Sequence, residues 1–275
     1  MTHDRYRTLL REFDAIISHA RAISDRLVGR PIEQKSHSYS DAIYTKLICH
    51  GISLRMLSPA MDPTDTSQIW DVASACAVAR ALIEAYDALV YISVDQVGPL
   101  EREFRVLLWE LHDQQRRLKM LEKIGSVDPR VAGIRSRANE LTKKLTGHSF
   151  YASATNEVRS KVARGEAPAV HLSQRDLNAA TGINHDYYVT ATMWLPQYVH
   201  TFPYSVHQLM NFRAGEPEAR HVSSMPLQYS MAFLAKAVEG MVQIWPEGDA
   251  ERSEETERLL QLWGAVAENG VRDAG

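Results

Sequence analysis

The stretch that decides the fold is SQIWDVASACAVARALIEAYDALVYISVD, residues 67–95. Its apolar residues fall on nearly every face of an α-helix, and its polar side chains Arg80, Glu84, Asp87 and Tyr91 follow one another at intervals of four, three and four positions. At about 100° per residue, this spacing places the four side chains on one stripe. A helix that is apolar all round is normally buried. We therefore expect the stripe to lie inside a helical protein, where its charges need partners, and to be part of a site. The alternatives are a structural network that fixes this helix to its neighbours, or a stripe that faces solvent.

Helical periodicity continues over most of the chain. Besides the helix at 67–95, it predicts long helices over residues 6–27, 40–57, 100–121, 129–145, 185–199, 223–245 and 250–268, a shorter one at 173–182, and a further turn over 203–212. No apolar/polar alternation lasts long enough for a strand. The sequence thus predicts an all-α multi-helix bundle of about eight to nine helices, in a single domain covering residues 1–275. Residues 146–172 contain Gly147, Gly165 and Pro168 and are the candidate for a flexible connection.

The composition is that of an ordinary globular protein, with 275 residues, 45% hydrophobic and 24% charged. Cys49 and Cys76 are 27 positions apart and have no zinc-ligand spacing, which indicates reduced core cysteines. The N-terminus has no apolar signal segment, and no long uncharged apolar run occurs. GxGxxG, GxxxxGK[ST] and GxSxG motifs are absent. We therefore expect a cytoplasmic protein that does not enter a membrane and that uses no metal and no cofactor.

The net charge of −3 conceals two regions of opposite sign. Residues 102–164 contain fourteen Lys and Arg against seven Asp and Glu, so this segment carries +7 and the remainder −10. Residues 247–273 supply eight acids and only three arginines. The basic segment can face nucleic acid, pair with the acidic tail of the same or a neighbouring chain, or simply be solvated, as most charged helix surfaces are.

A second group of polar and aromatic residues lies between positions 184 and 207. Its members are Asn184, His185, Asp186, Tyr187, Tyr188, Trp194, Tyr198, His200, Tyr204 and His207. Such rings and imidazoles can line a pocket that stacks a base and offers a general acid or base, although bundles also bury tyrosines for packing alone. The candidates for substrate binding are Tyr188, Trp194, Tyr204 and His207, together with Asp87 and Tyr91 from the stripe. Whether this cluster meets the stripe in space is left open by the sequence.

Two short motifs carry a resemblance to a known family. They are Ala79-Arg80-Ala81-Leu82-Ile83-Glu84 and a tyrosine-rich helix that ends Tyr198-Val199-His200 before Pro203 and Ser205. Over residues 40–210 the chain resembles a family of uncharacterised all-helical bacterial proteins related to HEPN-type nucleases and phage-defence proteins. The resemblance implies Arg80, Glu84 and His200 as catalytic residues, and it brings no established activity.

HEPN ribonucleases separate an arginine from a histidine by four to six residues and act on RNA without a metal. Three pairs in this chain have that spacing: Arg30/His37, Arg105/His112 and Arg164/His171. With 23 arginines and 11 histidines, about as many are expected by chance. Arg105 and His112 form the one pair inside a predicted helix and are kept as reserve site residues.

Three functional hypotheses follow from these patterns. The leading one is a HEPN-like protein that binds RNA through residues 102–164 and, if it also cleaves RNA, does so with Arg80, Glu84 and His200. The second is a non-enzymatic helical interaction protein, a homodimer in which the Arg80 network fixes the packing. The third is a small-molecule pocket between helices, lined by Tyr188, Trp194 and Tyr204.

Overall fold

A computed structural model describes residues 1–32, 34–59, 69–211 and 213–271. Every regular element in these ranges is helical, which confirms the all-α class. The described residues form eleven α-helices, so the predicted number of eight to nine is too low. One helix that the sequence did not predict is α6 (Asn156–Ala163), where Thr155 accepts a hydrogen bond from the Val158 N–H as its N-cap. Its eight residues are too few to show a clear apolar period.

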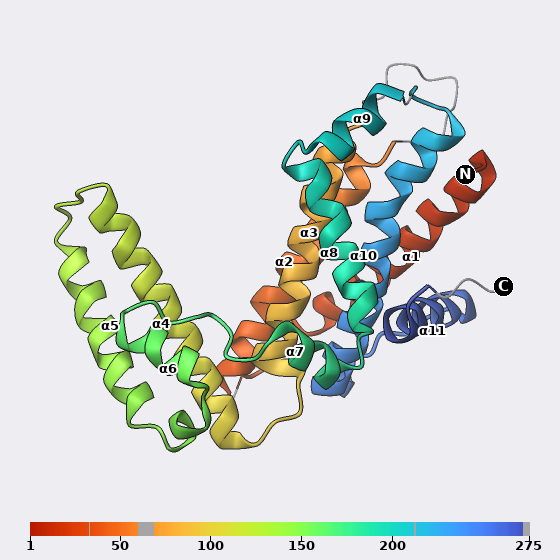
Figure 1. Cartoon of the computed structure of the whole chain (residues 1–275). Helices are drawn as coiled ribbons and strands as arrows, with labels where there is room; N and C mark the ends of the chain where they lie inside the picture. The colour runs from red at the N-terminus through yellow and green to blue at the C-terminus, as the bar shows by residue number, and fades with distance from the viewer. Residues whose placement is uncertain (33, 60–68, 212, 272–275) are drawn as a thin grey trace.

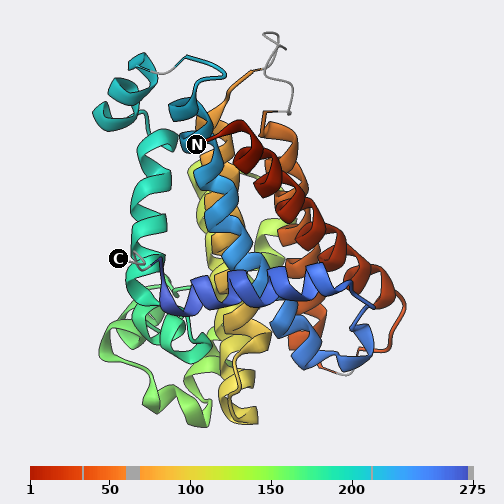
Figure 2. The same cartoon turned by 90° about the vertical axis from the view of Figure 1, so that its right-hand side faces the viewer.

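The long helices pack into a main bundle around α3. They are α1 (His3–Arg26), α2 (Lys35–Leu57), α3 (Val72–Leu89), α8 (His185–Val199), α10 (Pro217–Ile244) and α11 (Glu254–Asn269). α3 packs against α2, α8 and α10 (Figure 1), and α11 lies across α10 and α1 (Figure 2). Ala79, Leu82 and Ile83 of α3 are fully buried, as the apolar pattern of this stretch predicts.

Local capping sets where the central helices begin and end. α3 begins after Asp71, whose carboxylate accepts a hydrogen bond from the Ser74 N–H at 2.9 Å, and it continues into a π-helical turn, η1 (Val90–Val94). Residues 67 and 68 of the predicted helix lie outside the described ranges. α2 begins five residues before the predicted position 40. α10 begins six residues before position 223, with Pro217 in its first turn, where proline is favoured.

The basic segment forms an arm that extends away from the main bundle. The arm consists of α4 (Pro99–Lys123), α5 (Arg130–Thr146), the 3-10 turn η2 (Ser149–Ser153) and α6 (Figure 1). It has an apolar core of its own, which is made of Phe104, Leu108, Leu111, Leu141, Leu145, Ala154, Val158, Val162 and Ala167. Residues 102–164 therefore lie together in space and hold their positive charge on one outlying part of the protein.

Short elements link the arm and the long helices. α7 (Gln174–Thr181) ends at Gly182, which has the left-handed backbone (φ 70°) that glycine adopts without strain, as expected for the predicted helix at 173–182. α9 (Pro203–Asn211) follows α8, and η3 (Pro246–Gly248) joins α10 to α11. No helix of the described chain combines the length and the apolar composition that crossing a bilayer requires.

Candidate functional site

The first half of the α3 stripe meets the end of α8. Arg80 Nε donates to Glu84 Oε1 at 3.0 Å, and Arg80 Nη1 lies 3.5 Å from His200 Nε2. The stripe and the cluster at 184–207, whose proximity the sequence left open, are therefore in contact here. The side chains of Arg80 and Glu84 are 38% and 62% exposed, so the prediction that they are buried is wrong. The helices packed against α3 cover its other faces and leave this one at the surface.

A strained turn places His200 at this position. His200 is the C-cap of α8, and the next residue, Thr201, has φ 53°; it is the one residue other than glycine with positive φ among those described. The Phe202 N–H donates back to the Gln197 carbonyl at 3.2 Å, which closes a Schellman-type turn. Glycine is the usual residue at the left-handed position, because a β-branched side chain is crowded there. The strain of Thr201 thus lies directly beside the imidazole that contacts Arg80.

Asp87 lies one turn further along the stripe and is half-buried. Its Oδ2 accepts a hydrogen bond from the Tyr188 hydroxyl at 2.7 Å, and its Oδ1 accepts one from Gln174 Nε2 at 3.3 Å. Burial raises the pKa of Asp87 to about 7, although both hydrogen bonds favour the ionised form. At neutral pH the Asp87 carboxyl is therefore protonated in a substantial fraction of the molecules. The sequence predicted Asp87 and Tyr188 as site residues but gave no signal for Gln174.

Tyr91, the last residue of the stripe, is fully buried at the root of the arm. Its hydroxyl is 2.8 Å from His171 Nδ1, and its backbone carbonyl accepts a hydrogen bond from Arg105 Nη1 at 2.9 Å. Arg105 also pairs with Asp95 at 2.7 Å and with Glu101, its neighbour one helical turn earlier, at 2.9 Å. Burial and the positive charge of Arg105 lower the pKa of His171 to about 4. This buried ionic network joins η1 and α4 to the segment that precedes α7.

The reserve pair Arg105 and His112 does not form a site together. Arg105 is 1% exposed and all of its described contacts are within the network at the arm root, whereas His112 Nδ1 lies 2.8 Å from the Ala167 carbonyl oxygen. Arg105 instead lies near His171, the histidine of another pair with the same spacing. Sequence spacing could not reveal this contact, because the two residues come from separate elements.

The remaining predicted residues Trp194, Tyr204 and His207 lie on α8 and α9, outside the two cavities described below. Trp194 packs on Tyr198 with ring centroids 4.7 Å apart. Tyr198 donates to Gln208, whose Nε2 in turn donates to the Tyr204 hydroxyl at 2.9 Å. Tyr204 is 47% exposed and His207 is also exposed, so both are accessible at the surface.

An aromatic cavity does exist, but other residues line it. It measures about 590 Å³ and lies between α8, α10 and α11, against Tyr187, Tyr229 and Trp263. Tyr188, Trp194 and Tyr204, which the sequence predicted for a small-molecule pocket, are not among its lining residues. Periodicity shows that Tyr187 and Tyr188 point in different directions from the helix axis, but it does not show which direction meets α10 and α11.

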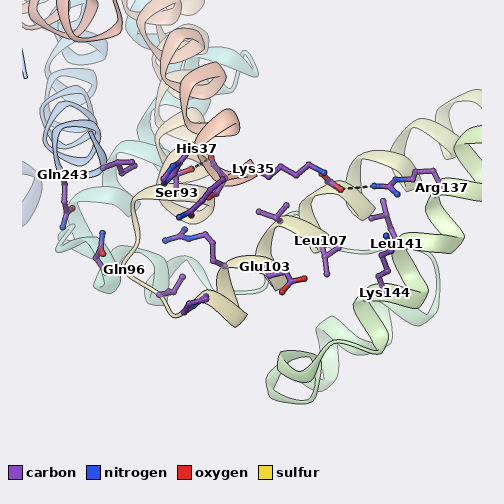
Figure 3. A pocket seen from close by; sticks show the side chains of 18 residues that line it. Lys35, His37, Ser93, Gln96, Glu103, Leu107, Arg137, Leu141, Lys144 and Gln243 are labelled. Carbon is purple, nitrogen blue, oxygen red and sulfur yellow. Dashed lines mark hydrogen bonds and ion pairs between the residues drawn. The ribbon is translucent and has the colours of Figure 1, made fainter. Parts of the chain in front are cut away.

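A larger cavity of about 740 Å³ lies where the arm leaves the bundle (Figure 3). Glu110 of α4 stands at its edge, pairs with Lys35 of α2, accepts a hydrogen bond from the Tyr39 hydroxyl at 2.9 Å and lies 3.5 Å from Arg137 of α5. Neither Lys35 nor Glu110 was predicted as a site residue. Each is an ordinary charged residue in its own helix, and only the fold brings them together.

Among the described residues, no three His, Cys, Asp or Glu side chains are close enough to hold a metal ion together. Comparison of the chain with protein-family models, with curated proteins and with solved structures finds no match. What the site can do is therefore judged from its own residues.

Proposed function

We propose that this protein binds RNA and cleaves it without a metal at the surface formed by Arg80, Glu84 and His200. One observation carries the proposal: a guanidinium held by a carboxylate at 3.0 Å lies 3.5 Å from an exposed imidazole. An arginine and a histidine at an open surface can supply a phosphate-binding cation and a general base, which together can support phosphodiester cleavage in RNA.

RNA supplies its own nucleophile, the 2′-hydroxyl, which DNA lacks. In the proposed step His200 takes the proton of this hydroxyl, the 2′ oxygen bonds to the adjacent phosphorus, and the 5′ oxygen of the next nucleotide leaves and takes a proton from water. The products are a 2′,3′-cyclic phosphate and a 5′-hydroxyl. Arg80 binds the phosphate oxygens, on which charge accumulates in the transition state. Glu84 is a positioning residue that holds the guanidinium.

The arm provides the binding surface in this proposal. Its segment 102–164 carries +7, whereas the rest of the chain is acidic. The α3 stripe connects the two regions, because Tyr91 contacts Arg105 of the arm and lies eleven residues from Arg80, roughly 16 Å along a helix. An RNA strand of a few nucleotides can span that distance. Binding should weaken as salt rises, because phosphate contacts release counterions.

The test is cleavage of a labelled RNA in the presence of EDTA. Wild-type protein should produce fragments ending in a cyclic phosphate, and His200→Gln should reduce the rate by about 100-fold or more. Arg80→Gln should reduce it similarly. His221→Gln provides the matched control, because His221 is an exposed histidine of α10. Cleavage that needs magnesium, or that persists in His200→Gln, would show that the activity is not that of this site.

A second function, self-association through the end of the arm, is favoured by a separate observation. Around the turn between α4 and α5, Met120, Ile124 and Val127 are 60%, 76% and 96% exposed. Exposed apolar side chains that form a contiguous patch are a feature of protein interaction surfaces. Light scattering of wild type and of the Ile124→Ser/Val127→Ser variant tests it: a dimer that this variant dissociates, with no binding of RNA, would favour the interaction protein.

A further inference from the structure

We propose that the cavity at the root of the arm binds a small phosphorylated molecule whose body carries hydroxyl groups, of the sugar phosphate class. Its volume of about 740 Å³ falls within the range of roughly 300–1,000 Å³ that is usual for small-molecule sites. The start of α2, the first turns of α4, one face of α5 and the end of α10 all contribute to its wall. This inference does not depend on cleavage of RNA, because none of the lining residues belongs to the Arg80 surface.

Cations gather on the arm side of the cavity. Arg137 and Lys144 of α5 stand there (Figure 3), and both also reach Glu140, at 3.0 and 2.8 Å. These ion pairs lie at the surface, with side chains 41% to 56% exposed, so each holds its partners only weakly. A phosphate group, with nearly two charges and three acceptor oxygens, competes well for both cations. The arm side is therefore suited to the phosphate.

Two further cations line the cavity, and one of them has unused hydrogen-bonding capacity. Arg102 donates to the Asp95 carbonyl through Nη2, while its buried Nη1 has no hydrogen-bond partner among the described residues. Lys35 is the other, and it is 58% exposed. Leaving a buried donor unpaired is costly, and an anion nearby would reduce that cost. The lining carries four Lys and Arg against the two carboxylates of Glu103 and Glu110.

Beside Lys35 and Arg102, the bundle side of the cavity carries uncharged polar side chains. Ser93, Gln96 and Gln243 lie there, at the opposite end from Arg137 and Lys144 (Figure 3). Amides and hydroxyls both donate and accept hydrogen bonds, as recognition of sugar hydroxyls requires. Glu103 lies between the two ends and can accept a hydrogen bond from a hydroxyl of the ligand.

The apolar wall distinguishes a sugar from a nucleobase. Its apolar side chains are aliphatic or proline, namely Val97, Pro99, Val106, Leu107, Leu141 and Ile244. His37 provides the one aromatic ring among the lining residues, and that ring packs against Trp245 at 4.6 Å. Bases bind most strongly where aromatic faces stack on them. The aliphatic wall with glutamine amides therefore favours a hydroxyl-bearing body over a nucleotide.

Calorimetry with glucose 6-phosphate as the probe tests the proposal on the full chain. We expect saturable binding that is stronger than that of glucose or of inorganic phosphate, since each of these occupies only one end of the cavity. AMP serves as the competing class. Absence of binding by glucose 6-phosphate at millimolar concentration overturns the proposal, and so does tighter binding of AMP.

Paired variants locate the site. Arg137→Gln/Lys144→Gln should weaken binding of glucose 6-phosphate by about tenfold or more, because both phosphate contacts are lost. The control Arg7→Gln/Arg21→Gln removes the same charge from exposed positions on α1 and should change affinity less than about twofold. Gln243→Leu should weaken binding of glucose 6-phosphate and leave that of inorganic phosphate unchanged. If both double variants lose affinity for glucose 6-phosphate equally, the ligand is attracted only by the overall charge of the protein, and the proposed site is wrong.

Discussion

Arg80 and His200 are separated by 120 residues in the sequence, and the structure places Arg80 Nη1 3.5 Å from His200 Nε2. Neither side chain is locked in the core, and Glu84, which holds the guanidinium, is 62% exposed. A contact between exposed groups contributes little to stability. Packing therefore gains little from this contact, whereas a ligand can reach both groups, as the proposed cleavage of RNA requires.

The first prediction separates these explanations. Arg80→Gln and Glu84→Gln should each change the free energy of unfolding by less than about 0.5 kcal/mol. Exposed ion pairs one helical turn apart contribute only a few tenths of a kcal/mol to stability. Urea unfolding followed by circular dichroism measures the change. A loss of several kcal/mol would identify the pair as scaffolding, as the interaction-protein hypothesis requires.

The second prediction concerns the pH dependence of stability. Asp87 has a pKa of about 7 in the folded protein and about 3.8 as its ordinary value. Between these pH values the folded state keeps a proton that the unfolded chain releases. The contribution of Asp87 to stability is therefore fully present below about pH 4 and is lost as the pH rises towards 7, by at most about 1.4 kcal/mol per pH unit.

Asp87→Asn should remove that part of the pH dependence and raise the melting temperature at pH 8, because the amide has no charge to bury. Thermal melts from pH 4 to pH 8 provide the measurement. Asp25→Asn, at an exposed position of α1, should keep the wild-type profile. A wild-type profile in Asp87→Asn would mean that this carboxyl is ionised throughout the range.

The third prediction tests the network at the root of the arm. Arg105→Met should destabilise the protein by about 3–5 kcal/mol, because it removes the ion-pair partner of the buried Asp95 carboxylate. Arg117→Met, at a half-exposed position of the same helix, should cost less than about 0.5 kcal/mol. Urea titration compares the two variants, and similar midpoints would show that Arg105 is dispensable for folding.

The fourth prediction uses the strained turn after α8. Thr201→Gly should stabilise the protein by about 1 kcal/mol. Glycine adopts the left-handed conformation without strain, and the energy gained in this way exceeds the cost of the greater conformational entropy of glycine in the unfolded chain. If the strain serves to place His200, the same variant should slow RNA cleavage while it raises the melting temperature. A lower melting temperature would indicate that the Thr201 side chain makes a contact that outweighs its strain.

The sequence by itself determined the helices, because apolar periodicity is a local property of the chain. The buried face of α3, the proline at the start of α4 and the glycine at the end of α7 can all be inferred from neighbouring residues. The same local signal failed for α6, which is too short to display a period. The sequence also located the positive charge in residues 102–164, because charge is a property of residue type alone.

Only the tertiary structure decided which polar groups meet. Arg80 was expected inside the bundle, yet the packing of neighbouring helices leaves it at the surface, while Arg105, in a helix with a basic surface, is buried to join the arm to the bundle. Exposure depends on which elements cover a face, and that follows from contacts between segments far apart in the chain. For the same reason the partners of Asp87 and Tyr91, namely Gln174 and His171, could not be recognised before the fold was known.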